Sequence, residues 1–244
     1  MQPKSKASVL QFEGLEVVVH RKPRRRTMTI QMGPEEPIKI LTAMRVSDHD
    51  VLKFLNMKSK WIHKNIQEFE KRPKIVKRQA LRGEEWMYLG QPVVVSDAIT
   101  LLKKPFVVFS EGLLTVYWPE KLWALRDQNR HLAMPWIQAA QKKEAERIFK
   151  ERIQFYGAQM HVRPKRVRLM RAETRWGSCS SKQNLNLNWK LLGAPLEVLD
   201  AIVVHELAHL KHMNHSKVFW NFVEQFAPNH TEADQWLKDN QHLL

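Results

Sequence analysis

The segment that most constrains this chain is an apolar run that continues directly into a cluster of histidines. VLDAIVV (residues 198–204) is followed by HELAHLKHMNHSKVFW (residues 205–220), which holds four histidines and one glutamate within its first eleven positions. The pattern predicts a helix from about Pro195 to Met213. An apolar stripe runs along one side of this helix, so we expect it to pack its back on a core and present its histidines to a cleft. The stripe consists of Leu199, Val203, Leu207 and Leu210.

The spacing within HELAH indicates a metal site. His205 and His209 are four positions apart, which places their rings about one turn apart on the same helix face. Two neutral imidazoles with an open coordination position suit zinc, which polarises a carbonyl group and lowers the pKa of bound water to about 7. Glu206, next to the first histidine, is then the expected general base.

The third ligand must come from further along the chain. His212 continues the same helix face, but its Cα lies about 10 Å along the helix axis from that of His205, too far for both to hold one ion easily. His215 follows Asn214, and asparagine tolerates the left-handed conformation that ends a helix, so the chain can turn back there. We therefore predict His215 as the third ligand. The alternatives are two carboxylates from the following helices, Glu224 and Glu232.

The first half of the chain has mostly strand patterns. Residues 10–47 alternate or are rich in β-branched side chains, residues 48–70 have the spacing of an amphipathic helix, and strand patterns return between residues 84 and 119. We expect residues 1–130 to form a β-rich, basic N-terminal region.

The second half begins with a long helical pattern from about Met134. Two strand patterns follow, at residues 165–172 and 184–189, joined by the turn-rich stretch 175–183, and two short helices close the chain at about 215–226 and 230–241. The expected fold class is therefore α+β, with residues 131–244 as a second domain.

The charge of the chain is strongly basic. Forty Lys and Arg against 25 Asp and Glu give a net charge of +15, of which +10 falls in residues 1–130 and +5 in residues 131–244. Such a surplus favours anionic partners, including nucleic acid, although dense basic runs are also typical of solvated faces and strand edges. The runs are Arg21–Arg26, Lys71–Arg78, and the set Arg163, Lys165, Arg166, Arg168, Arg171 and Arg175.

Composition also bears on the compartment. The single cysteine, Cys179, cannot form an intramolecular disulfide, and the first ten residues lack the apolar run of a signal peptide. No stretch approaches the length of a membrane-spanning helix. We expect a cytoplasmic protein that does not enter a membrane.

Four sequence motifs together resemble a known family. RWGSCSS (Arg175–Ser181), NLNLNW (Asn184–Trp189), VVHELAHLKHMNHSKVFW and the closing PNHTEADQWL are similar to the YgjP-like predicted metal-dependent hydrolases, relatives of the WLM and SprT-type zinc metallopeptidases. The resemblance covers about residues 165–240 and extends more loosely to the N-terminal half. It implies a minimal zincin-like domain with an HExxH active-site helix, zinc on His205, His209 and His215, and Glu206 as the base.

The motifs next to the histidine segment offer candidate substrate contacts. NLNLNW, with Asn186 at its centre, alternates in the manner of a cleft-edge strand that pairs with an extended peptide, or of an ordinary strand whose asparagines face solvent. Arg175 can stabilise an oxyanion or an anionic substrate group and Trp176 can wall a cleft, or both can simply pack around a turn. No spacing ties Cys179 to a base, which favours a structural role for it over that of a nucleophile.

Three functions are compatible with these features. The first is a zinc-dependent peptidase with Glu206 as the base. The second is a metal-dependent hydrolase of an anionic nonpeptide substrate, such as a nucleoside triphosphate, held by the basic residues between 163 and 175. The third is a nucleic-acid-binding protein with a structural metal, in which the run at Arg21–Arg26 contacts phosphates. A protease acting on proteins bound to nucleic acid would combine the first and the third.

Overall fold

The chain forms two compact units, Met1–Lys74 and Ile75–Leu244. The computed structural model describes residues 6–33, 36–71, 78–110, 112–172 and 175–244. Within these ranges, three small sheets are combined with helices, so the expected α+β class is confirmed. The boundary expected after residue 130 lies inside the second unit.

The first unit is a four-stranded sheet with one helix packed on it. Its strands are β1 (Lys6–Phe12), β2 (Leu15–Lys22), β3 (Thr29–Gly33) and β4 (Glu36–Ala43), in the order β1-β2-β4-β3. β2 and β4 run parallel, and the other neighbouring pairs are antiparallel. Alternate residues of the two central strands are buried and pack with α1 (Asp48–Lys71), as the alternating pattern predicts: Val17 and Val19 of β2, and Ile38 and Ile40 of β4. The strands and helix expected between residues 10 and 70 are therefore confirmed.

Polar contacts hold the junction between β4 and α1. The backbone N–H of Asp50 donates to Ser47 Oγ (3.1 Å), and the Ser47 N–H donates back to Asp50 Oδ2 (3.2 Å), which caps the helix reciprocally. Arg21, the first residue of the first basic run, is buried and donates to Asp48 and to the Val46 carbonyl (3.0 Å). This arginine therefore has a structural role within the first unit.

A second four-stranded sheet opens the second unit. Its strands are β5 (Glu85–Tyr88), β6 (Gln91–Thr100), β7 (Phe106–Ser110) and β8 (Leu113–Pro119), in the order β5-β6-β8-β7. The short helix α2 (Glu120–Trp123) and the 3-10 turn η1 (Arg130–Leu132) lead into the long α3 (Ala133–Gln159).

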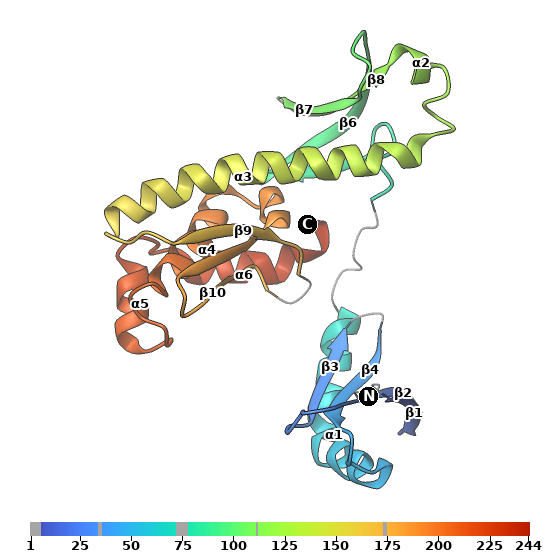
Figure 1. Ribbon diagram of the computed structural model, residues 1–244, viewed down its shortest axis with the longest axis vertical. Helices are drawn as coiled ribbons and strands as arrows, with labels where there is room; N and C mark the ends of the chain where they lie inside the picture. The colour runs from blue at the N-terminus through green and yellow to red at the C-terminus, as the bar shows by residue number, and fades with distance from the viewer. Residues whose placement is uncertain (1–5, 34–35, 72–77, 111, 173–174) are drawn as a thin grey trace. The chain divides into compact units, whose positions relative to one another are not determined.

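Helix α3 serves two hydrophobic cores. Its 27 residues span about 40 Å. Ala133 and Ile137 pack on the second sheet, whereas Ile148, Phe149 and Ile153 pack in a separate core with the elements that follow. The ribbon shows α3 running past both groups of strands (Figure 1). The strands between residues 85 and 119 therefore share a unit with the C-terminal helices because α3 joins them.

The third sheet has three strands, β9 (Arg166–Met170), β10 (Gly177–Cys179) and β11 (Asn184–Asn188), in the order β10-β11-β9. β11 is antiparallel to β10 and parallel to β9. Of the two interpretations of NLNLNW, a cleft-edge strand or an ordinary strand, the cleft edge is therefore wrong, because this strand has a neighbour on each side. Alternation indicates that a strand has one buried face and one polar face. A central strand and an edge strand can both have this pattern, so alternation does not distinguish between them.

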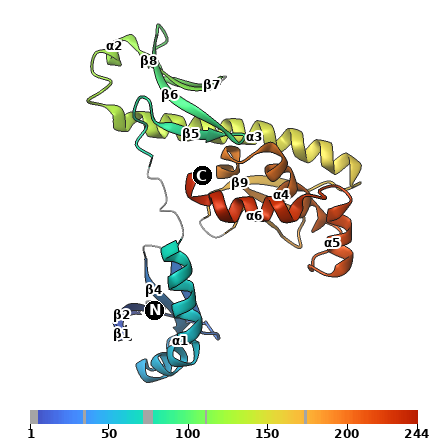
Figure 2. The ribbon, with the colours of Figure 1, turned by 180° about the vertical axis from the view of Figure 1, so that it is seen from behind.

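Helices cover one face of the third sheet. After the 3-10 turn η2 (Trp189–Gly193) come α4 (Leu196–Ala208), α5 (Lys217–Glu224), α6 (His230–Asn240) and the 3-10 turn η3 (Gln241–Leu243). The strands lie in front of α4 and α6 in Figure 1 and behind them in the reverse view of Figure 2. Leu185 and Leu187 of β11 are fully buried in the core that they form with these helices.

A close backbone contact fixes the start of α4. In the turn between β5 and β6, the Leu89 N–H donates to the Leu192 carbonyl (2.8 Å), and Gly90 has a φ of +79°. A Cβ at Gly90 would lie 2.8 Å from the Cα of Pro195, the residue before α4. Both the backbone conformation and the space therefore require glycine here.

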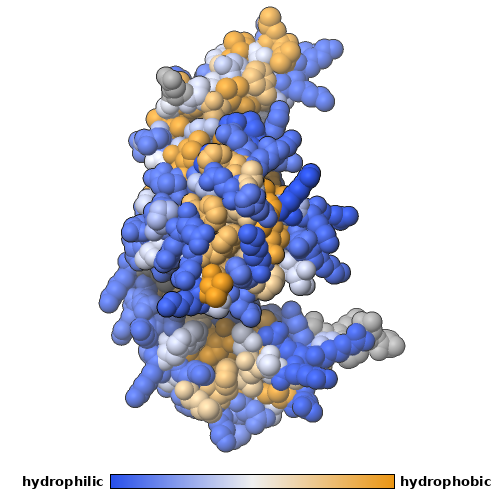
Figure 3. All heavy atoms as spheres, turned by 90° about the vertical axis from the view of Figure 1, so that its left-hand side faces the viewer, coloured by the Kyte–Doolittle hydropathy of each residue, from blue (hydrophilic) through white to orange (hydrophobic). Residues whose placement is uncertain are grey.

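The described helices include none that is both long and apolar enough to cross a membrane. On the face drawn in Figure 3, hydrophilic residues surround smaller apolar areas.

Candidate metal centre

Helix α4 carries the first two histidines and is buried on most of its surface. Leu199, Val203 and Leu207 are fully buried, as expected. The helix ends at Ala208, however, five residues before the expected end at Met213. Tight backbone bonds close its last turn, such as Leu210 N to the Leu207 carbonyl (3.0 Å).

The turn that follows α4 also differs from the expected one. The non-glycine residues with a positive φ do not include Asn214, so a left-handed asparagine does not redirect the chain. The chain is redirected instead by the early end of α4, because the residues after Ala208 no longer follow the helix axis and can fold back. His215 therefore returns to the helix by a different route from the one that the sequence suggested.

Three imidazoles meet at this point. One ligand nitrogen from each of His205, His209 and His215 lies within 4.8 Å of the others, and the Nε2 atoms of His205 and His215 are 3.1 Å apart. Nitrogens that share a tetrahedral zinc lie roughly 3.3 Å apart, given zinc to nitrogen bonds of about 2.0–2.1 Å. The three rings could therefore hold one zinc-type ion with small adjustments.

A backbone contact orients the second histidine. The Nδ1 atom of His209 lies 3.2 Å from the His212 carbonyl, which can only accept, so Nδ1 carries the proton and Nε2 is left free. The His212 ring itself packs edge-on against Phe222 (5.6 Å between centroids) and does not join the group of three. Within the described residues, neither Glu224 nor Glu232, the alternative ligands, belongs to that group.

Two aromatic residues of α5 support the imidazoles. Phe219 is fully buried, and its ring centroid lies 5.0, 4.7 and 4.8 Å from those of His205, His209 and His215 respectively. Trp220 stacks against His215 (5.7 Å, 27°). Sequence patterns assign Trp220 to the core and single out neither residue for the site, although their position four and five residues after His215 follows from the N-cap at Ser216.

Glu206 is buried beside the imidazoles with an unpaired oxygen. The residue is 5% exposed, and its Oε2 has no hydrogen-bond partner in the described part of the chain. Burial raises the pKa of Glu206 from its ordinary value of 4.5 to about 7, and the nearby Arg175 guanidinium opposes part of that shift. A carboxylate with these properties can accept a proton near neutral pH.

A glycine gives this carboxylate its space. A Cβ on Gly177 of β10 would lie 2.6 Å from Glu206 Cγ and 2.7 Å from its Cδ. Any larger residue would collide with the side chain of Glu206. Gly177 stands in the RWGSCSS motif, but the sequence alone does not identify it as a site residue.

Their surroundings keep His205 and His209 in the neutral form. Burial, together with the neighbouring histidines, lowers the pKa of His205 from 6.5 to about 4. Burial also lowers the pKa of His209. Neutral imidazoles are the form that binds metal, so this donor set and the unpaired Glu206 oxygen fit a catalytic zinc site.

The residues proposed for substrate contacts are distributed over both faces of the sheet. Arg175 is exposed and close enough to Glu206 to influence its pKa, and Trp176 is half-buried against the main core. Asn186 pairs with Ser178, one position beyond Gly177, so it lies on the face opposite Glu206, where its amide donates to Ser178 Oγ (3.1 Å). The structure therefore brings Arg175 near Glu206 and does not bring Asn186 there.

A different asparagine organises this region. Asn188 is 1% exposed, and its side-chain amide donates to the carbonyls of Ala172 (2.8 Å) and Arg175 (3.2 Å). Its backbone N–H donates to the Trp176 carbonyl (2.8 Å). Asn188 thereby ties the segment before β10 to the end of β11, a role that sequence alternation cannot reveal.

Cys179 lies at the end of β10. Burial, and after it the charge of Glu206, raises the pKa of the Cys179 thiol to about 11. The thiol therefore stays protonated at neutral pH, which is unfavourable for a nucleophile.

Comparisons with known proteins agree with the resemblance seen in the motifs. A family model described as YgjP-like, metallopeptidase domain, matches residues 26–240. Two solved metallopeptidase zymogens are each 24% identical to this chain: abylysin of Pyrococcus abyssi and jannalysin of Methanocaldococcus jannaschii. They cover 38% and 39% of this chain and 95% and 97% of their own, with TM-scores of 0.35 and 0.33. None of the curated proteins compared with the chain matches it.

The family match spans nearly the whole sequence and includes every residue of the histidine centre. The chain is a member of the YgjP-like metallopeptidase family, as the four sequence motifs predict.

Proposed function

We propose that this protein is a zinc-dependent peptidase in which His205, His209 and His215 hold the metal and Glu206 is the general base. One observation carries the proposal: three imidazole nitrogens converge beside a buried carboxylate oxygen that has no partner among the described residues. Structural histidines and a structural glutamate would be expected to satisfy one another or the backbone. Here one nitrogen of each imidazole faces the other two histidines, and Glu206 Oε2, on the residue next to His205, is left without a partner in the described part of the chain.

The residues divide the chemistry between them. A zinc ion bound there would supply the Lewis acid that polarises the substrate carbonyl and a water molecule. Glu206 takes the proton of the attacking water at its unpaired oxygen, and its raised pKa lets it pass that proton on to the leaving amine. Phe219 excludes water from behind the imidazoles, since it packs against all three.

The edge of β10 supports a peptide as the substrate. Among the described strands, β10 pairs with β11 alone, and Gly177 places it against Glu206. An extended peptide that paired with this edge would run past the carboxylate and the histidines. Arg175 and Trp176, just before β10, are placed to stabilise an oxyanion and to wall the cleft. Asn186 would contribute indirectly, through its hydrogen bond to Ser178.

The alternative substrate, a nucleoside triphosphate, has weaker support. It requires the basic residues between 163 and 175 to bind phosphate beside the metal. Arg166 and Arg168 stand opposite Asn184 and Asn186 in the β9–β11 register, on the face away from Glu206. Of the basic cluster, Arg175 is the residue whose charge acts on Glu206.

Metal content tests the ligand set. Elemental analysis of the purified protein should find about one zinc per chain. His215→Ala should retain roughly half or less after dialysis against a weak chelator, because the third ligand is lost. His212→Ala is the matched control, since its ring packs on Phe222 instead, and should retain as much zinc as the wild type. Equal zinc in His215→Ala and the wild type would contradict the assignment of His215.

Hydrolysis assays test the reaction. We expect casein to be hydrolysed, and Glu206→Gln to lower the rate about a thousandfold or more while zinc content stays unchanged. Hydrolysis of nucleoside triphosphates but not casein, with the same dependence on Glu206, would replace the peptidase proposal by the alternative. A full zinc site without any hydrolysis that depends on Glu206 would indicate a structural metal in a nucleic-acid-binding protein.

A further inference from the structure

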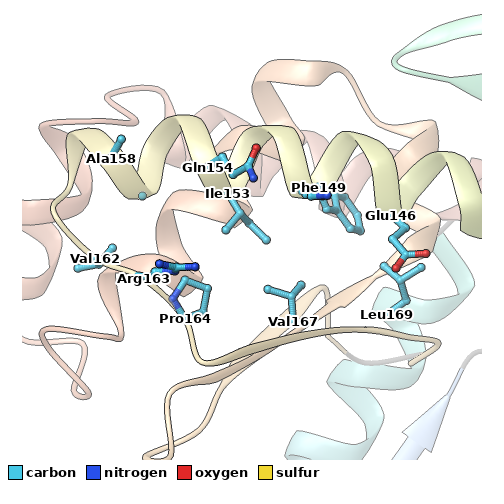
Figure 4. A pocket seen from close by; sticks show the side chains of 12 residues that line it. Glu146, Phe149, Ile153, Gln154, Ala158, Val162, Arg163, Pro164, Val167 and Leu169 are labelled. Carbon is cyan, nitrogen blue, oxygen red and sulfur yellow. The ribbon is translucent and has the colours of Figure 1, made fainter.

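A groove lies between α3 and β9, at the edge of the third sheet opposite to β10. Its volume is about 510 Å³. The buried Phe149 and Ile153 form its floor on the α3 side, and Val167 and Leu169 line it from β9. In Figure 4, Ile153 points from the helix toward the strand and Val167 points back toward the helix. The groove is thus an aliphatic slot beside a strand.

The groove has the length of a short strand. The α3 residues that line it extend from Glu146 to Ala158, which corresponds to about 18 Å along the helix axis. The five residues of β9 span roughly 17 Å. A further strand of about five residues would therefore fit along the outer side of β9 with its side chains under α3.

The outer edge of β9 offers backbone hydrogen bonds. Among the strands in the described ranges, β9 pairs with β11 alone. In the central strand β11, the backbone groups of Asn184 and Asn188 bond toward β10, since the Ser180 N–H donates to the Asn184 carbonyl (3.0 Å) and the Asn188 N–H to the Trp176 carbonyl (2.8 Å). Backbone groups alternate along a strand, so those of Leu185 and Leu187 point toward β9, where the parallel register pairs them with the groups of Arg166 and Arg168. The backbone groups of Val167 and Leu169 therefore point outward, away from β11. A strand edge of this kind is a template for pairing with another chain.

Basic side chains border this edge. Four cations in and before β9 are exposed, and within the described residues none has an ion pair or a side-chain hydrogen bond: Arg163, Lys165, Arg166 and Arg168. Arg166 and Arg168 lie on one face of the strand, whereas Val167 and Leu169 face the groove. The single acidic residue that lines the groove, Glu146, lies at its end near Leu169 (Figure 4).

We propose that the groove and the free edge of β9 bind an extended peptide segment in which aliphatic and acidic side chains alternate. The aliphatic side chains enter the groove between Ile153 and Val167, and the acidic ones, pointing the opposite way, meet Arg166 and Arg168. Alternation follows from strand geometry, because successive side chains of an added strand face opposite sides of the sheet. An aliphatic slot favours such a peptide over a nucleic acid, whose bases bind by stacking on exposed aromatic rings. This binding site is independent of the proposed hydrolysis.

The test uses the full chain and a defined probe. Fluorescence anisotropy would follow a fluorescein-labelled peptide of seven residues that alternates glutamate and valine, with glutamate at both ends. The protein carries Glu206→Gln so that hydrolysis cannot consume the probe. We expect saturable binding that weakens as salt is raised. A peptide with the same composition but consecutive valines, and one with lysine in place of glutamate, should each bind at least roughly tenfold more weakly.

Substitutions at position 167 separate backbone pairing from side-chain packing. Val167→Ala shortens the side chain and keeps the outward N–H, so we expect a loss of about threefold. Val167→Pro also removes that N–H, which does not pair with β11, and we expect a loss of roughly tenfold or more. Equal losses for the two variants would overturn the proposal, because they would show that the peptide does not pair with β9.

A second variant keeps the test decisive if the proline variant fails to fold. Val167→Asp places a charge in the groove and should weaken binding at least roughly tenfold. Val108→Asp is its matched control, since Val108 is similarly exposed (39% against 41%) on β7, an edge strand of another sheet. Unchanged binding in Val167→Asp, equal binding of the peptide with consecutive valines, or displacement of the probe by an equal concentration of oligothymidylate would each overturn the proposal.

Discussion

The two outer strands of the three-stranded sheet face very different surroundings. β10 lies against α4, where Gly177 leaves just enough room for the buried carboxylate of Glu206. β9 borders an aliphatic groove under α3, and its cations are exposed. Both strands offer a free backbone edge within the described part of the chain. Each outer strand therefore contributes backbone groups that can pair with a peptide. The helix packed beside that strand determines whether the edge is suited to catalysis or to peptide recognition.

The largest expected effect concerns the tight contact at the β10 edge. Gly177→Ala introduces a Cβ that would meet Glu206, so the carboxylate must move. A displacement of about 1 Å at a catalytic group lowers the rate roughly a hundredfold. Initial rates of peptide hydrolysis check this, with Gly33→Ala of β3 as the control, since a Cβ there would come no closer than 3.8 Å to a neighbouring side chain. Wild-type rates in Gly177→Ala would show that the β10 contact does not position Glu206.

The next effect concerns the clamp that holds the segment before β10. Asn188→Ala leaves two carbonyls, those of Ala172 and Arg175, without their side-chain donor. We expect the free energy of unfolding to fall by about 2–3 kcal/mol and the rate of hydrolysis to fall about tenfold. Denaturant titration followed by tryptophan fluorescence suits the measurement, because eight of the nine tryptophans lie in the second unit.

Asn186→Ala is the comparison for that clamp. Asn186 lies two positions earlier and donates to Ser178 on the polar face of the sheet, so we expect a loss of stability of less than about 1 kcal/mol. Equal losses for the two asparagines would mean that the clamp has no special role at the β10 edge.

A third effect concerns pH and requires metal-free protein, prepared with a chelator. The folded-state pKa of Glu206 is about 7, above its ordinary 4.5, so its contribution to stability is complete below pH 4.5 and is lost as the pH rises through 7. Glu206→Gln removes this loss and should stabilise the metal-free protein at pH 8 by about 1–3 kcal/mol, with little difference at pH 4. Unfolding titrations at both pH values give the comparison.

His205 has the opposite dependence in the same experiment. Its folded-state pKa of about 4 lies below its ordinary 6.5, so its contribution is complete above pH 6.5 and is lost as the pH falls through 4. The stability of Glu206→Gln should therefore rise with pH up to about 6.5 and then level off. Arg168→Gln, at the exposed β9 edge, should follow the wild-type curve. If the free energy of unfolding changed with pH in the same way for Glu206→Gln and the wild type, Glu206 would not be a buried carboxylate without a hydrogen-bond partner.

The smallest expected effect concerns the solvent exposure of the β9 side chains. Val167 is 41% exposed in the groove, so Val167→Ala should lower the free energy of unfolding by less than about 1 kcal/mol. Leu187, which occupies the same face of the central β11, is fully buried, and Leu187→Ala should cost about 2–5 kcal/mol. Similar costs at the two positions would indicate that something covers β9 and that its edge is not available for pairing.

Much of the centre could be predicted from local spacing. The four-residue interval between His205 and His209 and the position of Glu206 are properties of one helix, and a helix has a fixed period. The return of His215 was also predicted, although the chain turns because α4 ends at Ala208 rather than through Asn214. Helix ends depend on which backbone bonds close the last turn, and sequence patterns locate them poorly.

Residues defined by contacts between distant segments could not be predicted in this way. Gly177 matters because it meets Glu206, 29 positions later, and Asn188 matters because of the carbonyls that it binds in the segment before β10. Phe219 looks like any aromatic residue of an amphipathic helix until the helix docks on the three imidazoles. Side-chain type and spacing carry no information on such partners.

The sequence by itself determined the fold class and the family: an α+β chain, a helix with two histidines and a glutamate, and the family to which these motifs belong. The tertiary structure alone decided which strand of the third sheet is central, which edge faces Glu206 and which faces a groove. The physical reason is that helical and strand periods are local properties, whereas strand order and burial arise from packing between segments distant in sequence.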